Sequence, residues 1–249
     1  MAGMTNELKP DSTPRTPVAL VTGGSEGLGL ELVRALTERG WMVVTDARNA
    51  ARLRANVGSL RFADRVRALV GDVADATHRD ALGADVAALG GLDLLVLNAS
   101  TLGPLPMRPL RELTATELGE TIRGTAGANA ALMIELVEPL LARGGVVVGI
   151  SSDAAVEHYE TWGPYGAAKA ALDHLVQTFG AETGLTAYAV DPGDMRTRMH
   201  QDAFPDEDIS DRPLPESVVP RLLALVEQRP PTGRYRAADV ELPRAEVPA

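Results

Sequence analysis

Tyr165 and Lys169, in the run Tyr-Gly-Ala-Ala-Lys, are the residues of this 249-residue chain best suited to proton chemistry. Residues four apart on a helix share a face, which would place the Lys169 ammonium near the Tyr165 hydroxyl. A phenol has a pKa of about 10, and a nearby fixed cation favours the phenolate and lowers that pKa. Ser152 closes an earlier apolar run, where its hydroxyl could hold a substrate oxygen opposite Tyr165. Together a phenol, an ammonium and a hydroxyl predict general acid–base catalysis.

A glycine-bearing turn could hold an anionic cofactor. The apolar run 17–22 is followed by Gly-Gly-Ser-Glu-Gly-Leu-Gly at 23–29, and a helical pattern starts at once. Such a turn lets the backbone approach a pyrophosphate, while the helix N-terminus offers unpaired N–H groups and a positive dipole end. The G-x-x-x-G-x-G spacing differs from the standard dinucleotide fingerprint. The sequence therefore predicts a dinucleotide site, and the alternative is a packing turn without a ligand.

Short apolar runs alternate with longer helical patterns along the chain. The runs are short and nearly continuous, as expected for strands covered on both faces. The predicted strands are residues 17–22, 41–45, 66–70, 92–97, 146–150, 185–190 and 233–237. The predicted helices are 28–39, a single long helix within 112–143, 166–183 and 216–228, and 200–215 is expected to be a mobile loop. This alternation predicts an α/β fold, a single Rossmann-type doubly wound parallel sheet flanked by helices.

Composition narrows the class of protein. We expect a disordered leader at 1–15, one catalytic domain at 16–241 and a flexible tail at 242–249. The absence of cysteine excludes thiol catalysis and thiolate metal sites, and it fits a cytoplasmic protein. The net charge of −10, without a basic tract, argues against nucleic acid, and no apolar run suits a membrane span. The four histidines lack metal-ligand spacing, so no metal site is expected.

Taken in chain order, these motifs resemble the short-chain dehydrogenase/reductase family over about residues 16–237. Three further segments carry the likeness, together with the glycine turn and the Ser152, Tyr165, Lys169 spacing. They are Gly71-Asp72-Val73, at the family's adenine-contacting position; Asn98-Ala99-Ser100, similar to its Asn-Ala-Gly signature; and Asp191-Pro192-Gly193-Asp194-Met195-Arg196-Thr197, similar to its Pro-Gly-x-x-x-Thr segment.

The resemblance implies hydride transfer between NADP(H) and a small carbonyl or secondary alcohol substrate, by a homodimer or homotetramer. It assigns Tyr165 as general acid or base, Lys169 as the group that lowers the tyrosine pKa and binds the nicotinamide ribose, and Ser152 as the group that orients the carbonyl. The residues it implies for cofactor binding are Gly23, Ser25, Glu26, Gly27, Leu28, Gly29, Arg48, Asp72, Val73, Asn98, Ala99, Tyr165, Lys169, Pro192, Gly193, Met195 and Thr197.

The choice between NADP and NAD depends on the charge of the residue at the end of the second strand. An acidic residue there accepts hydrogen bonds from a ribose diol, whereas a basic residue pairs with a 2′-phosphate. The family's acidic position falls on Ala47, and Arg48 follows, which favours NADP. Two features favour NAD instead: Asp46 would serve if the strand bulges, and Glu26 stands in the turn where NADP-preferring relatives often carry a basic residue.

One departure from the family pattern leaves several readings open. The family's fourth-helix Asn, which helps to hold a proton-relay water, would fall within residues 121–126, and none of these is Asn. Asn129 could take the role or merely pack locally, and the relay could instead pass through Thr121, Thr125 or solvent. The missing Asn motivates the main alternative, a regulatory protein that binds the nicotinamide dinucleotide without turnover. A second alternative, an epimerase or dehydratase of the longer relatives, needs a longer substrate region.

Substrate contacts are expected from two stretches, 154–162 and 195–211. Six residues there could form an apolar pocket: His158, Tyr159, Trp162, Met195, Met199 and Phe204. Ordinary packing is the alternative for each of them.

Overall fold

The computed structural model describes residues 15–242, so nearly all of the expected leader and tail lies outside the described residues. Within this range seven strands form one sheet, in which every neighbouring pair is parallel. The strands are β1 (Val18–Val21), β2 (Met42–Ala47), β3 (Val66–Val70), β4 (Leu94–Leu97), β5 (Val146–Ile150), β6 (Thr186–Asp191) and β7 (Gly233–Arg236). Their order, β3-β2-β1-β4-β5-β6-β7, confirms the predicted Rossmann-type parallel sheet.

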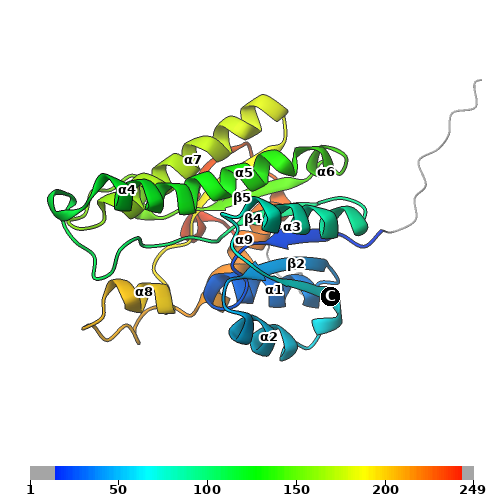
Figure 1. Ribbon diagram of the computed structural model, residues 1–249. Helices are drawn as coiled ribbons and strands as arrows, with labels where there is room; N and C mark the ends of the chain where they lie inside the picture. The colour runs from blue at the N-terminus through cyan, green and yellow to red at the C-terminus, as the bar shows by residue number, and fades with distance from the viewer. Residues whose placement is uncertain (1–14, 243–249) are drawn as a thin grey trace, which may run out of the picture.

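Helices cover both faces of the sheet. They are α1 (Gly27–Glu38), α2 (Ala50–Gly58), α3 (Ala76–Ala88), α4 (Ala115–Ile122), α5 (Ala128–Glu135), α6 (Val137–Leu141), α7 (Gly163–Thr183), α8 (Arg198–Ala203) and α9 (Pro215–Gln228). Helices α1 and α9 lie on one face, with α2 on the same side, while α3, α5 and α7 cover the other (Figure 1).

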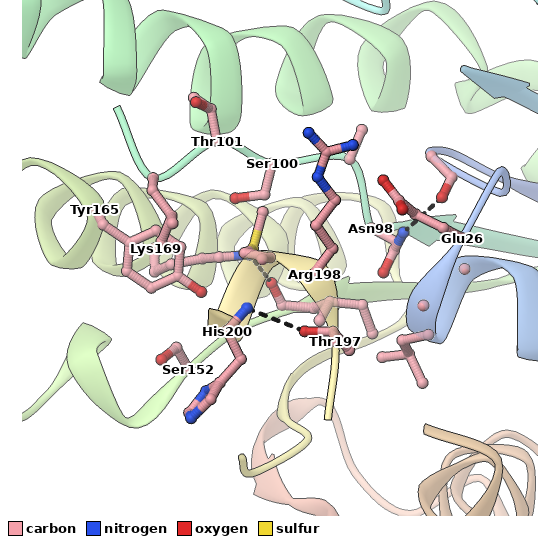
Figure 2. Close-up of a pocket in the computed structure, with 18 of the residues that line it drawn as sticks. Glu26, Asn98, Ser100, Thr101, Ser152, Tyr165, Lys169, Thr197, Arg198 and His200 are labelled. Atoms are coloured by element: carbon pink, nitrogen blue, oxygen red, sulfur yellow. Dashed lines mark hydrogen bonds between the residues drawn. The ribbon is translucent and has the colours of Figure 1, made fainter. Parts of the chain in front are cut away.

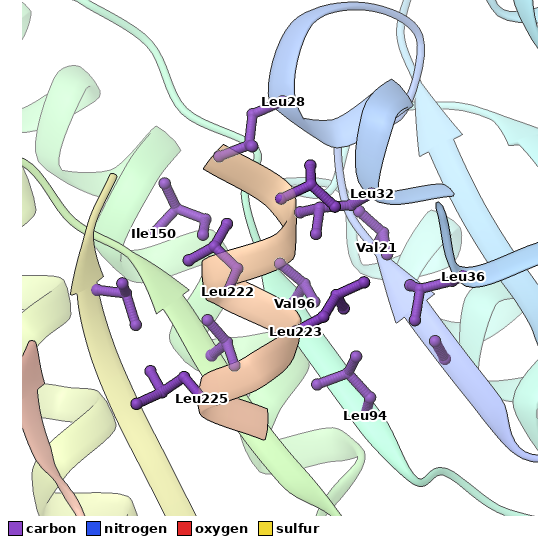
Figure 3. Close-up of a cluster of buried hydrophobic side chains, with 14 of the residues drawn as sticks. Val21, Leu28, Leu32, Leu36, Leu94, Val96, Ile150, Leu222, Leu223 and Leu225 are labelled. Atoms are coloured by element: carbon purple, nitrogen blue, oxygen red, sulfur yellow. The ribbon is translucent and has the colours of Figure 1, made fainter. Parts of the chain in front are cut away.

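The alternating side chains of each strand supply these two cores. In β1, Ala19 and Val21 join the core beneath α1 and α9, whereas Val18 and Leu20 join the core beneath α3, α5 and α7. The leucines of α9 pack onto the first of these layers (Figure 3). Because both faces of the strand are covered, all four β1 residues are buried and apolar, which explains the continuous apolar runs in the sequence.

The single long helix predicted within 112–143 is wrong. The segment forms α4, a π-helical turn at Arg123–Gly127, then α5 and α6, with a break at Leu136. Gly124 and Gly127 fall in the π-helical turn, where their lack of a side chain weakens regular helix. Pro139 has no N–H for the carbonyl of Glu135, which disfavours a continuous helix across Leu136, and it is accommodated in the first turn of α6. The hydrophobic pattern hid these interruptions because it persists across them.

Other helix boundaries follow capping chemistry. Helix α7 begins at Gly163, three residues before the predicted start, with Pro164 in its first turn, and it ends at Gly184 with φ 74°. The segment expected to be a mobile loop, 200–215, begins inside α8, whose first turn is capped by Thr197 accepting from the His200 N–H at 3.2 Å. The sequence analysis included neither α2 nor α3, which bury few apolar residues.

The sheet topology determines where a ligand can bind. Strands β1 and β4 are neighbours although they are not consecutive, so the connections on either side of them lead away in opposite directions. This arrangement opens a crevice at the carboxyl ends of the strands, the usual ligand site of such sheets. None of the helices between residues 15 and 242 is long and apolar enough to cross a membrane.

Candidate active site

A cavity of about 520 Å³ runs along the carboxyl ends of the strands. Its lining reaches from Arg48 and Asp72, after β2 and β3, to Tyr165 and Lys169 on α7. Every residue that the sequence assigned to catalysis or cofactor binding lines this cavity, and Figure 2 shows its central part. The fold thus brings together segments that lie far apart in the chain.

The proposed catalytic residues meet at one end of this cavity (Figure 2). Tyr165 and Lys169 are 8% and 2% exposed, and the Lys169 Nζ lies 5.5 Å from the centre of the Tyr165 ring. The ammonium donates to the carbonyl of Ile150 at 2.6 Å, which fixes it to the end of β5. The Ser152 hydroxyl donates to the Asp153 carboxylate at 2.9 Å. The predicted grouping of a phenol, an ammonium and a hydroxyl is therefore present.

The electrostatics of this pair differ from the sequence-based expectation. Burial raises the pKa of Tyr165 to about 12, although the Ser152 hydroxyl acts in the opposite direction. Burial also lowers the pKa of Lys169 to about 8, against the influence of the Asp173 carboxylate. The net pKa of Tyr165 therefore lies above its ordinary value, because desolvation of the phenolate dominates. At neutral pH the site presents a protonated phenol beside an ammonium that is mostly charged.

The glycine turn fits an anionic group. Gly23 and Gly27 have φ of 72° and 58°, a left-handed backbone that favours glycine. A Cβ at Gly29 would lie 2.3 Å from the Gly23 carbonyl oxygen, so this position tolerates no side chain. Glu26 is the N-cap of α1, but its side chain makes no capping hydrogen bond. The N–H groups of the first turn, which lies at the cavity, therefore have no side-chain acceptor from the N-cap. These features fit the pyrophosphate of a dinucleotide.

Asp46 has a different role from the one considered for it. Its side chain is buried; one oxygen accepts from the Gly23 N–H at 2.9 Å and the other lies 3.0 Å from His78 Nε2. Strand β2 pairs with β3 in regular register through this position, so there is no bulge. Asp46 lines the cavity, and its contacts with Gly23 and His78 anchor the glycine turn. The bulge on which the interpretation of Asp46 as an NAD-selecting residue depended is absent.

The opposite end of the cavity carries two arginines. Arg48 is largely exposed, and its Nη1 lies 3.9 Å from the Asp72 carboxylate. Arg52, in the first turn of α2, is ion-paired with Glu26 of the glycine turn. The sequence analysis missed Arg52, although a helix starting just after Arg48 would have indicated it.

Asn98 and Asn129 hold the segment after β4. Asn98 Nδ2 donates to the Thr22 carbonyl at 2.8 Å, joining this segment to the glycine turn. Asn129 is fully buried and donates to the carbonyls of Ala99 and Thr125 at 2.9 and 2.8 Å. Neither Asn129 nor Thr125 is among the residues that line the cavity. The contacts of Asn129 match the local-packing interpretation, and they support the backbone on which Asn98 and Ala99 sit.

The residues expected to contact the substrate were predicted only in part. Trp162, Met195 and Met199 line the cavity, and the Phe204 ring packs 5.7 Å from that of Trp162. The prediction that His158 and Tyr159 line the substrate pocket was wrong, because both are exposed and neither lines the cavity. Arg198 and His200 of α8 line it instead, although the sequence analysis had not assigned them to it (Figure 2).

A partly buried ion pair behind Ser152 was also missed. Arg234 of β7 donates to the Asp173 carboxylate at 3.0 Å and to the Ser152 carbonyl at 2.9 Å. The Ser151 hydroxyl donates to the same carboxylate at 2.7 Å. Asp173 is one helical turn after Lys169, so this ion pair joins α7 to the end of β5. The pairing of Asp173 with Arg234, 61 positions apart, left no local signal in the sequence.

Replacing Arg234 with Met should lower the free energy of unfolding by about 2–4 kcal/mol at pH 8, because the Asp173 carboxylate would remain buried without its arginine. Burial already raises the pKa of Asp173 above its ordinary value. Protonation at lower pH removes the uncompensated charge, so the loss should be smaller at pH 5. Urea denaturation at both pH values measures this effect. Arg236→Met, at an exposed position of the same strand, is the control, and an equal loss in both variants would contradict the assignment.

The sequence of this chain is similar to known short chain dehydrogenases and to a yeast oxidoreductase. The family model described as short chain dehydrogenase matches residues 17–208. An uncharacterized oxidoreductase of Saccharomyces cerevisiae is 45% identical over 56 residues, a match that spans 22% of this chain and 22% of the yeast protein.

Solved structures match over nearly the whole fold. A short chain dehydrogenase from Escherichia coli CFT073 complexed with NADPH is 26% identical, with a TM-score of 0.82, and the match covers 90% of this chain and 97% of that one. One from Shigella flexneri complexed with NADP has a TM-score of 0.83 at 24% identity, over 90% and 98% of the two chains. This chain belongs to the short chain dehydrogenase family.

Proposed function

We propose that the protein transfers a hydride between NADP(H) and a carbonyl or secondary alcohol substrate. The observation that carries this proposal is one continuous cavity. It has a glycine turn and Arg48 toward one end and buried Tyr165 and Lys169 at the other. The first end suits a phosphorylated dinucleotide, and the second supplies the proton that must accompany a hydride.

The roles of the side chains follow from their contacts. A nicotinamide dinucleotide supplies the hydride when bound, and the residues of the chain supply orientation and the proton. In reduction, the Tyr165 hydroxyl donates its proton to the substrate oxygen, and the neighbouring ammonium of Lys169 stabilises the negative charge left on the phenol oxygen. Lys169 would also hold the nicotinamide ribose. Ser152 orients the carbonyl oxygen and stabilises charge that develops on it.

The protonation state of Tyr165 suits the role of proton donor in reduction. A pKa of about 12 keeps the Tyr165 phenol protonated at neutral pH, which suits a proton donor. Oxidation would need the phenolate as base, and burial disfavours that form.

NADP is the proposed cofactor. Ala47, at the end of β2, places no carboxylate at the cavity, and Arg48 follows as a cation suited to a 2′-phosphate. The engagement of Asp46 with Gly23 and His78 supports the same choice. The NADP and NADPH complexes of the similar structures are consistent with it. A regulatory protein without turnover is less well supported, since it has no need of Tyr165 and Lys169 at the cavity.

Two finer expectations stay predictions. They are assembly into a homodimer or homotetramer and, from the lack of cysteine and not from the resemblance, a cytoplasmic location.

A screen of carbonyl compounds tests the proposal. Purified protein is mixed with NADPH or NADH and a panel of small aldehydes, ketones and keto acids, and the absorbance of the reduced cofactor is followed. We expect oxidation of NADPH with at least one carbonyl, and slower oxidation of NADH. NADPH binding without turnover of any compound in the panel would favour the regulatory alternative.

A further inference from the structure

His200 brings an imidazole nitrogen without a partner to the end of the cavity where Ser152 and Tyr165 lie. Its side chain lines the cavity and is only 11% exposed. Within residues 15–242, no group lies within hydrogen-bond distance of its Nε2, which is buried. Figure 2 draws the His200 ring at the same end of the cavity as Ser152. A buried polar atom without a partner costs free energy, and a ligand group that pairs with it recovers that cost.

Aromatic packing holds the His200 ring in this position. The ring centre lies 4.9 Å from that of Phe204, which in turn packs 5.7 Å from Trp162. Trp162 packs edge-on against Tyr165 at 5.5 Å, so this row of rings joins α8 to the start of α7. The other nitrogen of the imidazole, Nδ1, lies 3.8 Å from the Asp194 carboxylate. The ring therefore has a fixed place, with Nε2 left for a ligand.

The charges at this end of the cavity suit a neutral polar group better than an anion. Three carboxylates line the cavity here and, after burial, raise the pKa of the Tyr165 phenol: Asp153, Asp191 and Asp194. Of the cations that line this end, Lys169 donates to a backbone carbonyl and Arg198 is ion-paired within α8 at 3.6 Å. A hydroxyl group carries no charge, and it can donate to or accept from an imidazole nitrogen in either protonation state of the ring.

We propose that the substrate is a hydroxyaldehyde or hydroxyketone whose hydroxyl pairs with His200 Nε2 while its carbonyl lies at Ser152 and Tyr165. This inference rests on the proposed function, since it names the substrate class of that reaction. A C–H bond forms at the carbonyl carbon from the hydride of NADPH, the C=O π bond breaks, and the oxygen takes the Tyr165 proton. NADPH is oxidised to NADP and the substrate is reduced to a diol. His200 takes no part in the chemistry and acts as a specificity-determining residue.

The test compares each hydroxyketone with the ketone in which a methyl group replaces the hydroxyl. The pairs are hydroxyacetone with 2-butanone and 4-hydroxy-2-butanone with 2-pentanone, and kcat/KM is measured with saturating NADPH. His200→Leu should lower kcat/KM about tenfold for at least one hydroxyketone and leave its matched ketone nearly unchanged, since one neutral hydrogen bond is lost. Comparing the variant with wild type for each compound cancels the different intrinsic reactivities of the two carbonyls.

Two further variants separate the role of the nitrogen from a structural role of the ring. His200→Gln should retain part of the kcat/KM for the hydroxyketone, because a carboxamide also donates and accepts hydrogen bonds. His174→Leu is the matched control. His174 is an exposed residue of α7 and is not among those that line the cavity, so all four values should match wild type. Thermal unfolding of each variant shows whether the fold is retained.

Product inhibition of the wild-type protein supplies a measurement that needs no variant. Propane-1,2-diol and butane-1,3-diol are compared with 2-butanol and 2-pentanol as inhibitors of reduction of the best carbonyl from the screen. At least one diol should have an inhibition constant about tenfold below that of its matched alcohol, since only the diol pairs with Nε2.

The outcomes distinguish this inference from the proposed function. Equal losses for a hydroxyketone and its matched ketone in His200→Leu would overturn the inference, as would equal inhibition by each diol and its alcohol. Turnover of other carbonyls without turnover of either hydroxyketone would also overturn the inference alone. Absence of turnover with every carbonyl would instead remove the proposed function, and the inference with it.

Discussion

Replacing Tyr165 with Phe should lower the rate of carbonyl reduction about 10³-fold, since a positioned general acid contributes roughly 10²–10⁴-fold. The variant keeps the aromatic ring that packs edge-on against Trp162, so only the proton donor is lost. The Kd for NADPH, followed by the fluorescence of the reduced nicotinamide, should change little. Steady-state kinetics with the best carbonyl from the screen provide the measurement.

Tyr188→Phe is the matched control for this variant. Tyr188 is also buried, and its hydroxyl donates to the Pro230 carbonyl at 2.8 Å, away from the cavity. Its loss should reduce stability but leave turnover near the wild-type level. Undiminished turnover in Tyr165→Phe would contradict the assignment of the proton donor.

Replacing Lys169 with Met should lower reduction by about 10²–10³-fold, because no cation would stabilise the charge left on the Tyr165 oxygen. The pH dependence supplies a sharper signature. Burial lowers the pKa of Lys169 to about 8 and raises that of Tyr165 to about 12. As pH rises through about 8, the ammonium loses its proton while the phenol keeps its own. Wild-type reduction should therefore fall from pH 7 to pH 9.

The variant tests the origin of that fall. In Lys169→Met the residual rate should be nearly independent of pH between 7 and 9, since no group corresponding to Lys169 titrates there. Circular dichroism shows whether the variant is folded, because the ammonium also donates to the Ile150 carbonyl. A fall of the same size in the variant would assign the titration to another group.

The sequence was sufficient to predict the sheet and the position of the site. The central strands β1 and β5 are buried on both faces, so each reads as an apolar run. The glycine turn and Ser152 follow directly after these runs, which predicts their position at the strand ends. A parallel sheet brings those ends to one edge. Tyr165 and Lys169 then reach the same edge because α7 begins close to the end of β5.

The parts that the sequence did not predict depend on three-dimensional contacts. The contacts of the Asp46 carboxylate depend on what packs around the end of β2, where His78 on α3 lies 3.0 Å from one of its oxygens. The pKa of Tyr165 is set by burial, which no local spacing reveals. Arg234 meets Asp173 only because β7 joins the edge of the sheet beside β6.

The central claim is that a dinucleotide held at the glycine turn presents its nicotinamide to Tyr165 and Lys169. A crystal structure of the protein with bound NADP tests this claim most directly. We predict the pyrophosphate at the N-terminus of α1, the 2′-phosphate at Arg48, and the nicotinamide ring beside the Tyr165 hydroxyl. A dinucleotide bound elsewhere, or a nicotinamide ring directed away from Tyr165, would contradict the account.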